Sequence, residues 1–293
     1  MGLNRRDMYK FPWSRTDVPG AWIEVTDICD LSCRGCYRHT LTGHAPLEKL
    51  KEEVIALERI VNCSSIAIAG GEPLLYPHLL EIIEFIARRK LVARLLTNGE
   101  KLTSEMARDL KKAGLSHIQF HVDAQQDRPG WQDKNESEMN ELRQLYADRI
   151  RAIGGMQCGF HITVYRSSME YIPSVVRWFR ANMHKVQDLS FIAFRGLPAT
   201  DDLRYMAGGK EIDIHRLRVT CSTPQDISIT SEDILHAIQI VYPDIRPSAY
   251  LNGTTATDTY KCLVTPWIGT KEAIYGTIGP KAIEFMHAFT GIP

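Results

Sequence analysis

The sequence places three cysteines, Cys29, Cys33 and Cys36, at the spacing C-x3-C-x2-C. Thiolates are soft ligands, and clustered cysteines select iron–sulfur clusters, zinc or Cu(I). In a four-iron cluster, three cysteines leave one iron without a protein ligand, and that iron can bind a substrate or cofactor. The spacing therefore favours a reactive iron–sulfur centre.

A zinc site is the alternative interpretation of the same thiols. It needs a fourth ligand, for which His39, His44 or Cys63 are the candidates. Zinc sites with several cysteines more often use paired C-x2-C arrangements, which this segment lacks. A non-catalytic metal-binding or interaction module, with a structural zinc or a passive iron–sulfur site, thus remains the second hypothesis for function.

A second motif, Gly70-Gly71-Glu72-Pro73, directly follows a predicted strand. Glycine lets a backbone pass close to a ligand, and the glutamate adds a carboxylate acceptor. The cysteine motif, the aromatic Tyr37 after its third cysteine, and this GGEP segment together resemble the radical S-adenosylmethionine (SAM) superfamily.

The resemblance implies both cofactors and chemistry. In that family the three cysteines, here Cys29, Cys33 and Cys36, hold a [4Fe–4S] cluster, and the open iron chelates the amino and carboxylate groups of SAM. One electron cleaves SAM and releases a 5′-deoxyadenosyl radical, which takes a hydrogen atom from a substrate. A flavodoxin or ferredoxin would supply the electron. The substrate stays open between a peptide, a lipid-like molecule and a small molecule.

The resemblance also implies weaker SAM contacts beyond the GGEP segment. Asn98 lies in a T-N-G segment after the third strand, and His121 and Asp123 stand where the family often has S-x-D. Thr163 follows on the fifth strand, and Arg195 lies just past the end of the sixth. The alternatives are a plain turn at Asn98, a structural histidine at His121 and a solvated arginine at Arg195.

Strands and helices alternate along the first two thirds of the chain. The predicted strands are 21–26, 65–69, 93–97, 117–122, 158–164 and 189–194, and the predicted helices are 46–61, 79–90, 103–113, 138–153 and 172–182. Such alternation implies βαβ crossovers and a parallel sheet. We predict a partial (β/α)6 TIM-like barrel of the radical SAM type over residues 15–196, with an open doubly wound sheet as the alternative. In either fold the chemistry gathers at the C-terminal ends of the strands.

The pattern changes after residue 196. Helices are predicted at 231–241, capped by Thr230, and at 281–289. Residues 197–293 are predicted to form a C-terminal extension that could cover the substrate.

The composition narrows the class of protein. The 35 basic and 35 acidic residues balance, so bulk electrostatics predict no nucleic-acid binding. No apolar stretch is long enough to span a membrane, and residues 1–10 lack the apolar core of a signal peptide. The four other cysteines, Cys63, Cys158, Cys221 and Cys262, are scattered and read as inert buried thiols rather than a disulfide framework. A cytoplasmic location is therefore expected.

Overall fold

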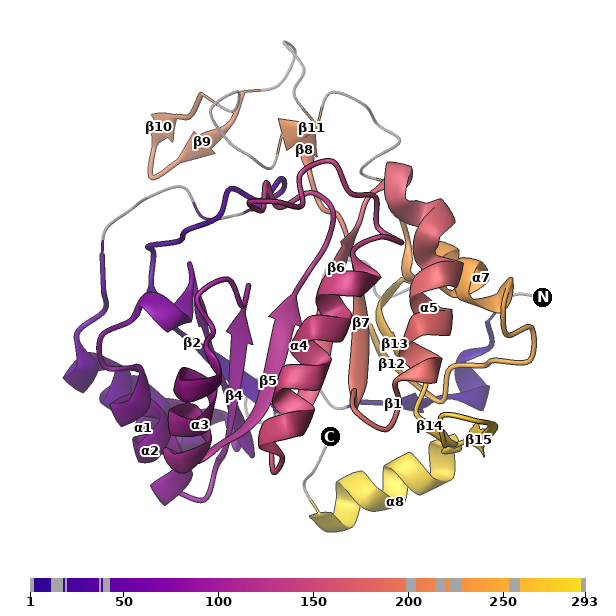
Figure 1. Ribbon diagram of the computed structural model, residues 1–293, viewed down its shortest axis with the longest axis horizontal. Coiled ribbons are helices and arrows are strands. Elements are labelled where there is room, and N and C mark those ends of the chain that lie inside the picture. Colours follow the sequence, from indigo (N-terminus) through magenta and orange to yellow (C-terminus); the bar gives the residue numbers. More distant parts are fainter. Residues whose placement is uncertain are drawn as a thin grey trace.

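A parallel sheet forms the centre of the protein (Figure 1). The computed structural model describes residues 3–11, 18, 20–36, 38, 43–198, 204–213, 220–221, 228–252 and 259–290. The sheet has six strands, which are β2 (Gly20–Thr26), β3 (Ser65–Gly70), β4 (Val92–Thr97), β5 (Leu115–His121), β6 (Gln157–Val164) and β7 (Asp188–Ala193).

The strand order decides between the two predicted folds. Neighbours in the sheet follow the chain order β2-β3-β4-β5-β6-β7, and every pairing is parallel. A doubly wound sheet reverses direction at a switch point, and this sheet does not. The predicted partial (β/α)6 barrel is therefore confirmed. Among the described strands, β2 and β7 lie at opposite edges and do not pair.

Each strand but β7 is followed by a helix. The helices are α1 (Leu47–Val61), α2 (Leu79–Arg88), α3 (Ser104–Lys112), α4 (Asn140–Ile153) and α5 (Ile172–Ala181). Each has an apolar stripe at helical spacing; in α2 it comprises Leu79, Ile82, Ile83 and Ile86. These stripes pack on alternate strand residues such as Ile66 and Ile68 to form the main core. The core therefore lies between helices α1–α4 and one face of the sheet.

The other strand residues form what we call the inner face, which points away from helices α1–α4. It comprises Trp22, Glu24, Ala67, Ala69, Arg94, Leu96, His117, Gln119, His121, Gly159, His161, Thr163, Asp188, Ser190 and Ile192. Charged and hydrogen-bonding side chains dominate its β4–β7 part. A face with this composition does not serve as a second hydrophobic core.

The remaining elements are short. They are β1 (Tyr9–Lys10), β12 (Ala249–Asn252) and β13 (Tyr260–Val264) in one sheet, the pairs β8 (Leu197–Pro198) with β11 (Thr220–Cys221), β9 (Met206–Ala207) with β10 (Lys210–Glu211), and β14 (Trp267–Gly269) with β15 (Ile274–Thr277), and the helices α7 (Ser231–Gln239) and α8 (Pro280–Thr290). Helix α7 packs on α5 and β7. The β8–β11 and β9–β10 ribbons lie above the arrowheads of the central strands (Figure 1). No described helix has the length and apolar character that crossing a bilayer requires.

Candidate functional site

The cysteine loop begins where β2 ends. The Thr26 hydroxyl accepts a hydrogen bond from the Ile28 N–H at 3.1 Å, which turns the chain out of the strand. Cys29 is exposed, and Cys33 and Cys36 are half-buried. The loop thus starts at the C-terminal edge of the parallel sheet, where chemistry is expected in such folds.

The GGEP segment lies directly against the start of this loop. The Gly71 N–H donates to the Thr26 carbonyl at 2.6 Å, and the Glu72 N–H donates to the Ile28 carbonyl at 2.7 Å. A Cβ atom on Gly70 would overlap the Thr26 carbonyl oxygen, and one on Gly71 would overlap that of Ile28. The two glycines are therefore required so that the two backbones can meet.

Glu72 is fully buried and connects three segments. Its carboxylate accepts from the Leu74 N–H at 2.9 Å, the Thr97 hydroxyl at 2.6 Å and the Asn98 N–H at 2.7 Å. Burial raises the pKa of Glu72 to about 7, against the opposing effect of these three donors. Through Glu72, the turn after β3 is fixed to the end of β4.

Asn98 reaches back to the cysteine loop. Its side-chain amide donates to the Asp30 carboxylate at 2.8 Å and lies 3.9 Å from the Cys29 sulfur. Its side-chain oxygen accepts from the Glu100 N–H at 2.8 Å. Asn98 therefore forms the turn and contacts the cysteine loop at the same time, and its contact with SAM stays a prediction.

His121, Asp123 and Thr163 form one cluster at the ends of β5 and β6. The His121 Nε2 lies 2.8 Å from the Asp123 carboxylate and 3.0 Å from the Thr163 hydroxyl. Asp123 also accepts from the N–H groups of Thr163 and Gln125, at 3.3 and 2.9 Å. Burial would raise the pKa of the Asp123 carboxyl, but the His121 charge and these donors outweigh it and lower that pKa. The carboxylate is thus held ionised beside His121.

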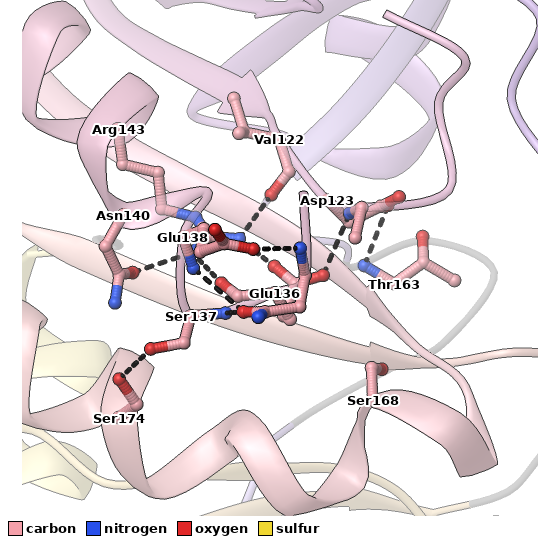
Figure 2. Close-up of polar contacts among 12 residues, drawn as sticks. Val122, Asp123, Glu136, Ser137, Glu138, Asn140, Arg143, Thr163, Ser168 and Ser174 are labelled. Carbon is pink, nitrogen blue, oxygen red and sulfur yellow. Dashed lines mark hydrogen bonds and ion pairs between the residues drawn. The ribbon is translucent and has the colours of Figure 1, made fainter. Parts of the chain in front are cut away.

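A buried ion pair fixes the backbone around Asp123 (Figure 2). Arg143 of α4 pairs with Glu136 and donates to the Val122 carbonyl at 2.8 Å. The Glu136 carboxylate in turn accepts from the Ala124 N–H at 2.9 Å. The residues on both sides of Asp123 are therefore held by one pair of charges that is almost completely buried.

A second buried arginine joins the ends of β4 and β5. Arg128 donates to the Asn98 carbonyl at 2.9 Å, to the His121 carbonyl at 3.4 Å and to the Glu100 carboxylate at 2.9 Å. No sequence motif indicates Arg128, Arg143 or Glu136 as part of this site. They lie in a polar stretch that looks solvated, and no local spacing signals their burial.

The end of the cysteine loop that lies away from β2 crosses to the far strands. The Arg34 N–H donates to the Gln125 carbonyl at 2.8 Å, and the Tyr165 hydroxyl donates to the Arg34 carbonyl at 2.5 Å. The Arg34 guanidinium lies over the rings of Tyr165 and Phe194, 5.0 and 5.7 Å from their centroids. The loop thus extends over the sheet edge from β2 to β7.

The three thiols influence one another electrostatically. Burial, followed by the charges of Asp123, Cys29 and Cys36, raises the pKa of the Cys33 thiol to about 12. Burial, with smaller effects from neighbours that include Cys36, also raises the pKa of Cys29. If these thiols ionise together, the gathered thiolates require a cation. Binding a metal would supply that cation and remove the proton from each thiol.

The type of donor on this loop suits an iron–sulfur cluster. In the part of the chain that the structure describes, no three His, Cys, Asp or Glu side chains converge closely enough to hold one metal ion. Cys29, Cys33 and Cys36 are three free thiols on one loop, and thiolates are the ligands that hold iron–sulfur clusters. By the chemistry of these donors, the residues present fit a [4Fe–4S] cluster.

The candidate zinc ligands are placed differently. The His44 ring bonds the Thr26 hydroxyl at 3.0 Å, and Cys63 is buried before β3, at the opposite end of that strand from Gly70. His39 lies outside the described residues, as does the predicted cofactor residue Tyr37. Arg195 is exposed and donates to the Ile229 carbonyl at 2.7 Å, so it contacts the chain just before α7.

Comparison with known sequences assigns this arrangement to a family. Residues 23–157, which run from β2 into β6, match the sequence model of the radical SAM superfamily. The chain contains a radical SAM domain. The match confirms the radical SAM resemblance at the level of the superfamily, whose enzymes use a [4Fe–4S] cluster and SAM.

Curated relatives cover part of the chain. The GTP 3′,8-cyclase of Desulforamulus reducens is 29% identical over 239 residues, which are 74% of this chain and 62% of that protein. The PqqA peptide cyclase of Streptomyces rochei is 29% identical over 113 residues, 35% of this chain and 29% of that protein. The chain thus spans less than two thirds of each of these relatives.

Solved structures share the fold at low sequence identity. Streptococcus suis SuiB superposes with a TM-score of 0.52 at 14% identity, over 82% of this chain and 50% of that chain. The enzyme anSMEcpe with bound AdoMet gives 0.51 at 16% identity, over 77% and 58%. These similarities support the partial barrel and carry no information about the substrate.

Proposed function

We propose that this chain binds a [4Fe–4S] cluster through Cys29, Cys33 and Cys36 and uses it to cleave SAM reductively. When bound, the cluster supplies one electron to SAM, and the resulting 5′-deoxyadenosyl radical takes a hydrogen atom from a substrate. The proposal rests most directly on the backbone contact between residues 26–28 and the GGEP segment, because this contact joins the start of the cysteine loop to a glycine turn at the C-terminal edge of the sheet.

The residues of this edge divide into contact and support roles in the proposal. Gly70 and Gly71 present backbone carbonyls toward the SAM amino group, and Glu72 and Pro73 hold that turn in place. Asn98 stabilises the loop beside Cys29 through its 2.8 Å bond to Asp30.

The polar cluster on β5 and β6 contributes a second part of the proposed SAM site. His121 keeps 36% of its side chain exposed, so it can contact SAM directly, together with Thr163. The Asp123 carboxylate is already bound on several sides, which makes it a support for His121. Arg195 and Tyr37 complete the proposed set.

The substrate and the electron donor are also matters of proposal. We infer that the reductant is a flavodoxin or ferredoxin, consistent with a cytoplasmic protein. The substrate is a peptide, a lipid-like molecule or a small molecule. Residues 197–293 are proposed as the lobe that covers it, in keeping with the ribbons above the strand ends (Figure 1).

The test is anaerobic reconstitution with iron and sulfide, followed by dithionite and SAM. We expect about four irons per chain and the formation of 5′-deoxyadenosine, quantified by chromatography. The Cys33→Ala variant should lose both. A matched Cys262→Ala variant, altered in β13 away from the loop, should keep both.

Two results would contradict the proposal. If Cys33→Ala produced as much 5′-deoxyadenosine as the unaltered protein, the assignment of the cysteines would be wrong. If the protein purified from cells held zinc and took up no iron on reconstitution, the three thiols would form a structural site instead.

A further inference from the structure

On the inner face, Asp188 already has polar partners of its own. Its carboxylate lies across Gly159, where a Cβ atom would overlap it, and so reaches from β7 to β5. There it accepts from the Gln119 amide at 2.8 Å and lies 2.7 Å from the His117 Nε2, at ion-pair distance although not aligned as a hydrogen bond. Asp188 therefore already contacts His117 and Gln119.

Arg94 differs from this group because its charge has no partner. It lies on the inner face of β4, in register with Ala67 and His117 on the neighbouring strands. Its side chain is half-buried and makes no hydrogen bond or ion pair with any described residue. A guanidinium has five donors, and withdrawing it from water without an acceptor is unfavourable.

A titratable residue two strands away also fails to compensate the Arg94 charge. His161 of β6 is affected by Arg94, and burial, more than any neighbouring charge, lowers its pKa to about 4. At neutral pH its ring is uncharged and offers a hydrogen bond only. Among the described inner-face residues of β4–β7, Arg94 is thus the cation left for an external anion.

The β2–β3 part of the inner face is more apolar, apart from Glu24, whose carboxylate pairs with Arg38. Ala67 and Ala69 leave a low floor, and Trp22 stands beside it with 56% of its surface exposed. One row across three neighbouring strands contains Trp22, Ala67 and Arg94. The Cα atoms of Trp22 and Arg94 are therefore about 10 Å apart. A flat apolar surface and a cation therefore border the same shallow floor.

We propose that Arg94 binds a carboxylate or phosphate group of the substrate, and that Trp22 packs on a flat apolar part of the same molecule. A guanidinium matches both anions because it can bind them in a bidentate manner. This inference rests on the proposed function, since it names the class of substrate for that reaction.

The position of Arg94 also sets the size of the substrate. Asn98 follows Arg94 by four residues in nearly extended chain and lies at the edge that carries the cysteine loop. The Cα atoms of Arg94 and Asn98 are therefore about 13 Å apart. The anion and the reacting carbon of the substrate should stand apart by a distance of this order.

The test uses chemical protection in the full-length, cluster-loaded protein. Phenylglyoxal modifies accessible arginines, and mass spectrometry of the digested chain reports the rate at each site. Benzoate and phenyl phosphate serve as anionic probes, and benzamide as the uncharged counterpart. Arg88, exposed on α2, is the internal control.

We expect either anion to slow the modification of Arg94 severalfold, with no effect of benzamide and none at Arg88. The stronger of the two anions identifies the group that the substrate carries. Equal rates at Arg94 with benzoate and benzamide, or equal protection of Arg88, would overturn the anion site.

A Trp22→Ala variant tests the apolar contact separately. In the unaltered protein, benzoate should protect Arg94 at lower concentration than acetate does. In the variant this difference should vanish while acetate still protects. A preference for benzoate that survives the substitution would remove Trp22 from the site.

The assay needs no cleavage of SAM, so the two proposals fail separately. Protection of Arg94 in a protein that forms no 5′-deoxyadenosine would contradict the proposed function alone. Formation of 5′-deoxyadenosine without protection would contradict the anion site alone.

Discussion

The two ends of the cysteine loop are held by different means. At the β2–β3 end, backbone meets backbone, and glycines at positions 70 and 71 permit the approach. At the β6–β7 end, side chains make the contacts. The Tyr165 hydroxyl donates to the Arg34 carbonyl, and the rings of Tyr165 and Phe194 lie against the Arg34 guanidinium. Backbone contact leaves a motif that can be recognised in a sequence, whereas side-chain support leaves none.

The largest expected effect concerns the support behind the far end. Glu136→Gln would leave the buried Arg143 cation without its partner and weaken the backbone that presents Gln125 to Arg34. Removing one member of a buried ion pair costs roughly 3–5 kcal/mol, so we expect a loss of about 3 kcal/mol in the free energy of unfolding, measured with urea. Glu138→Gln, two residues on and exposed, is the matched control. Equal stability of the two variants would show that the pair does not support the loop.

Next in size is a change at the near end. Gly71→Ala forces the GGEP turn away from the Ile28 carbonyl. We expect a loss of roughly 1–3 kcal/mol in stability, together with iron binding well below four per chain. Gly276→Ala, in β15 with open space around it, should change neither quantity. Full iron binding by Gly71→Ala would mean that the close approach is not needed for the cluster.

A pH titration sharpens the role of Glu72. Because burial raises its pKa to about 7 in the folded chain, the folded state holds a proton that the unfolded state releases near 4.5. Between these values the folded state binds more protons, so stability should fall as pH rises, by up to about 1.4 kcal/mol per pH unit. Glu72→Gln removes this contribution.

The comparison isolates Glu72 from other titrating groups. Free energies of unfolding of the two proteins, measured from pH 5 to pH 8, should show a difference that changes in favour of the glutamine variant as pH rises. A constant difference would indicate that Glu72 does not titrate in this range.

The smallest effect is expected at the far end itself. Tyr165→Phe removes one hydrogen bond, to the Arg34 carbonyl, and keeps the ring. We expect a loss of about 1 kcal/mol in stability with iron binding retained. A complete loss of iron would show that this single contact, rather than the glycine turn, fixes the loop.

Sequence reasoning located the strands and helices because their apolar periodicity is strong and uninterrupted. The strand over Ser65–Gly70 and the apolar stripe of α2 are examples. Periodicity does not give the order of the strands in the sheet. The structure shows that each strand from β2 to β7 pairs with the next one in the chain. The motifs around Cys29 and Gly70 were visible because chemistry and close backbone approach restrict residue type.

The support of the site could not be predicted. Arg128, Arg143 and Glu136 belong to a stretch whose charges suggest solvent exposure, and only the tertiary fold buries them together. Arg94 likewise lacks a partner among the described residues because of the residues that the neighbouring strands place around it. Local patterns do not contain such information.

The central claim is that three thiols leave one iron open for SAM. The most direct measurement is the electron paramagnetic resonance spectrum of the reduced, reconstituted protein, recorded with and without SAM. The account predicts a four-iron signal whose g values shift when SAM is added, and no such signal in Cys33→Ala. A cluster signal that stays unchanged at saturating SAM would contradict it, because every iron would then already have a ligand that SAM does not replace.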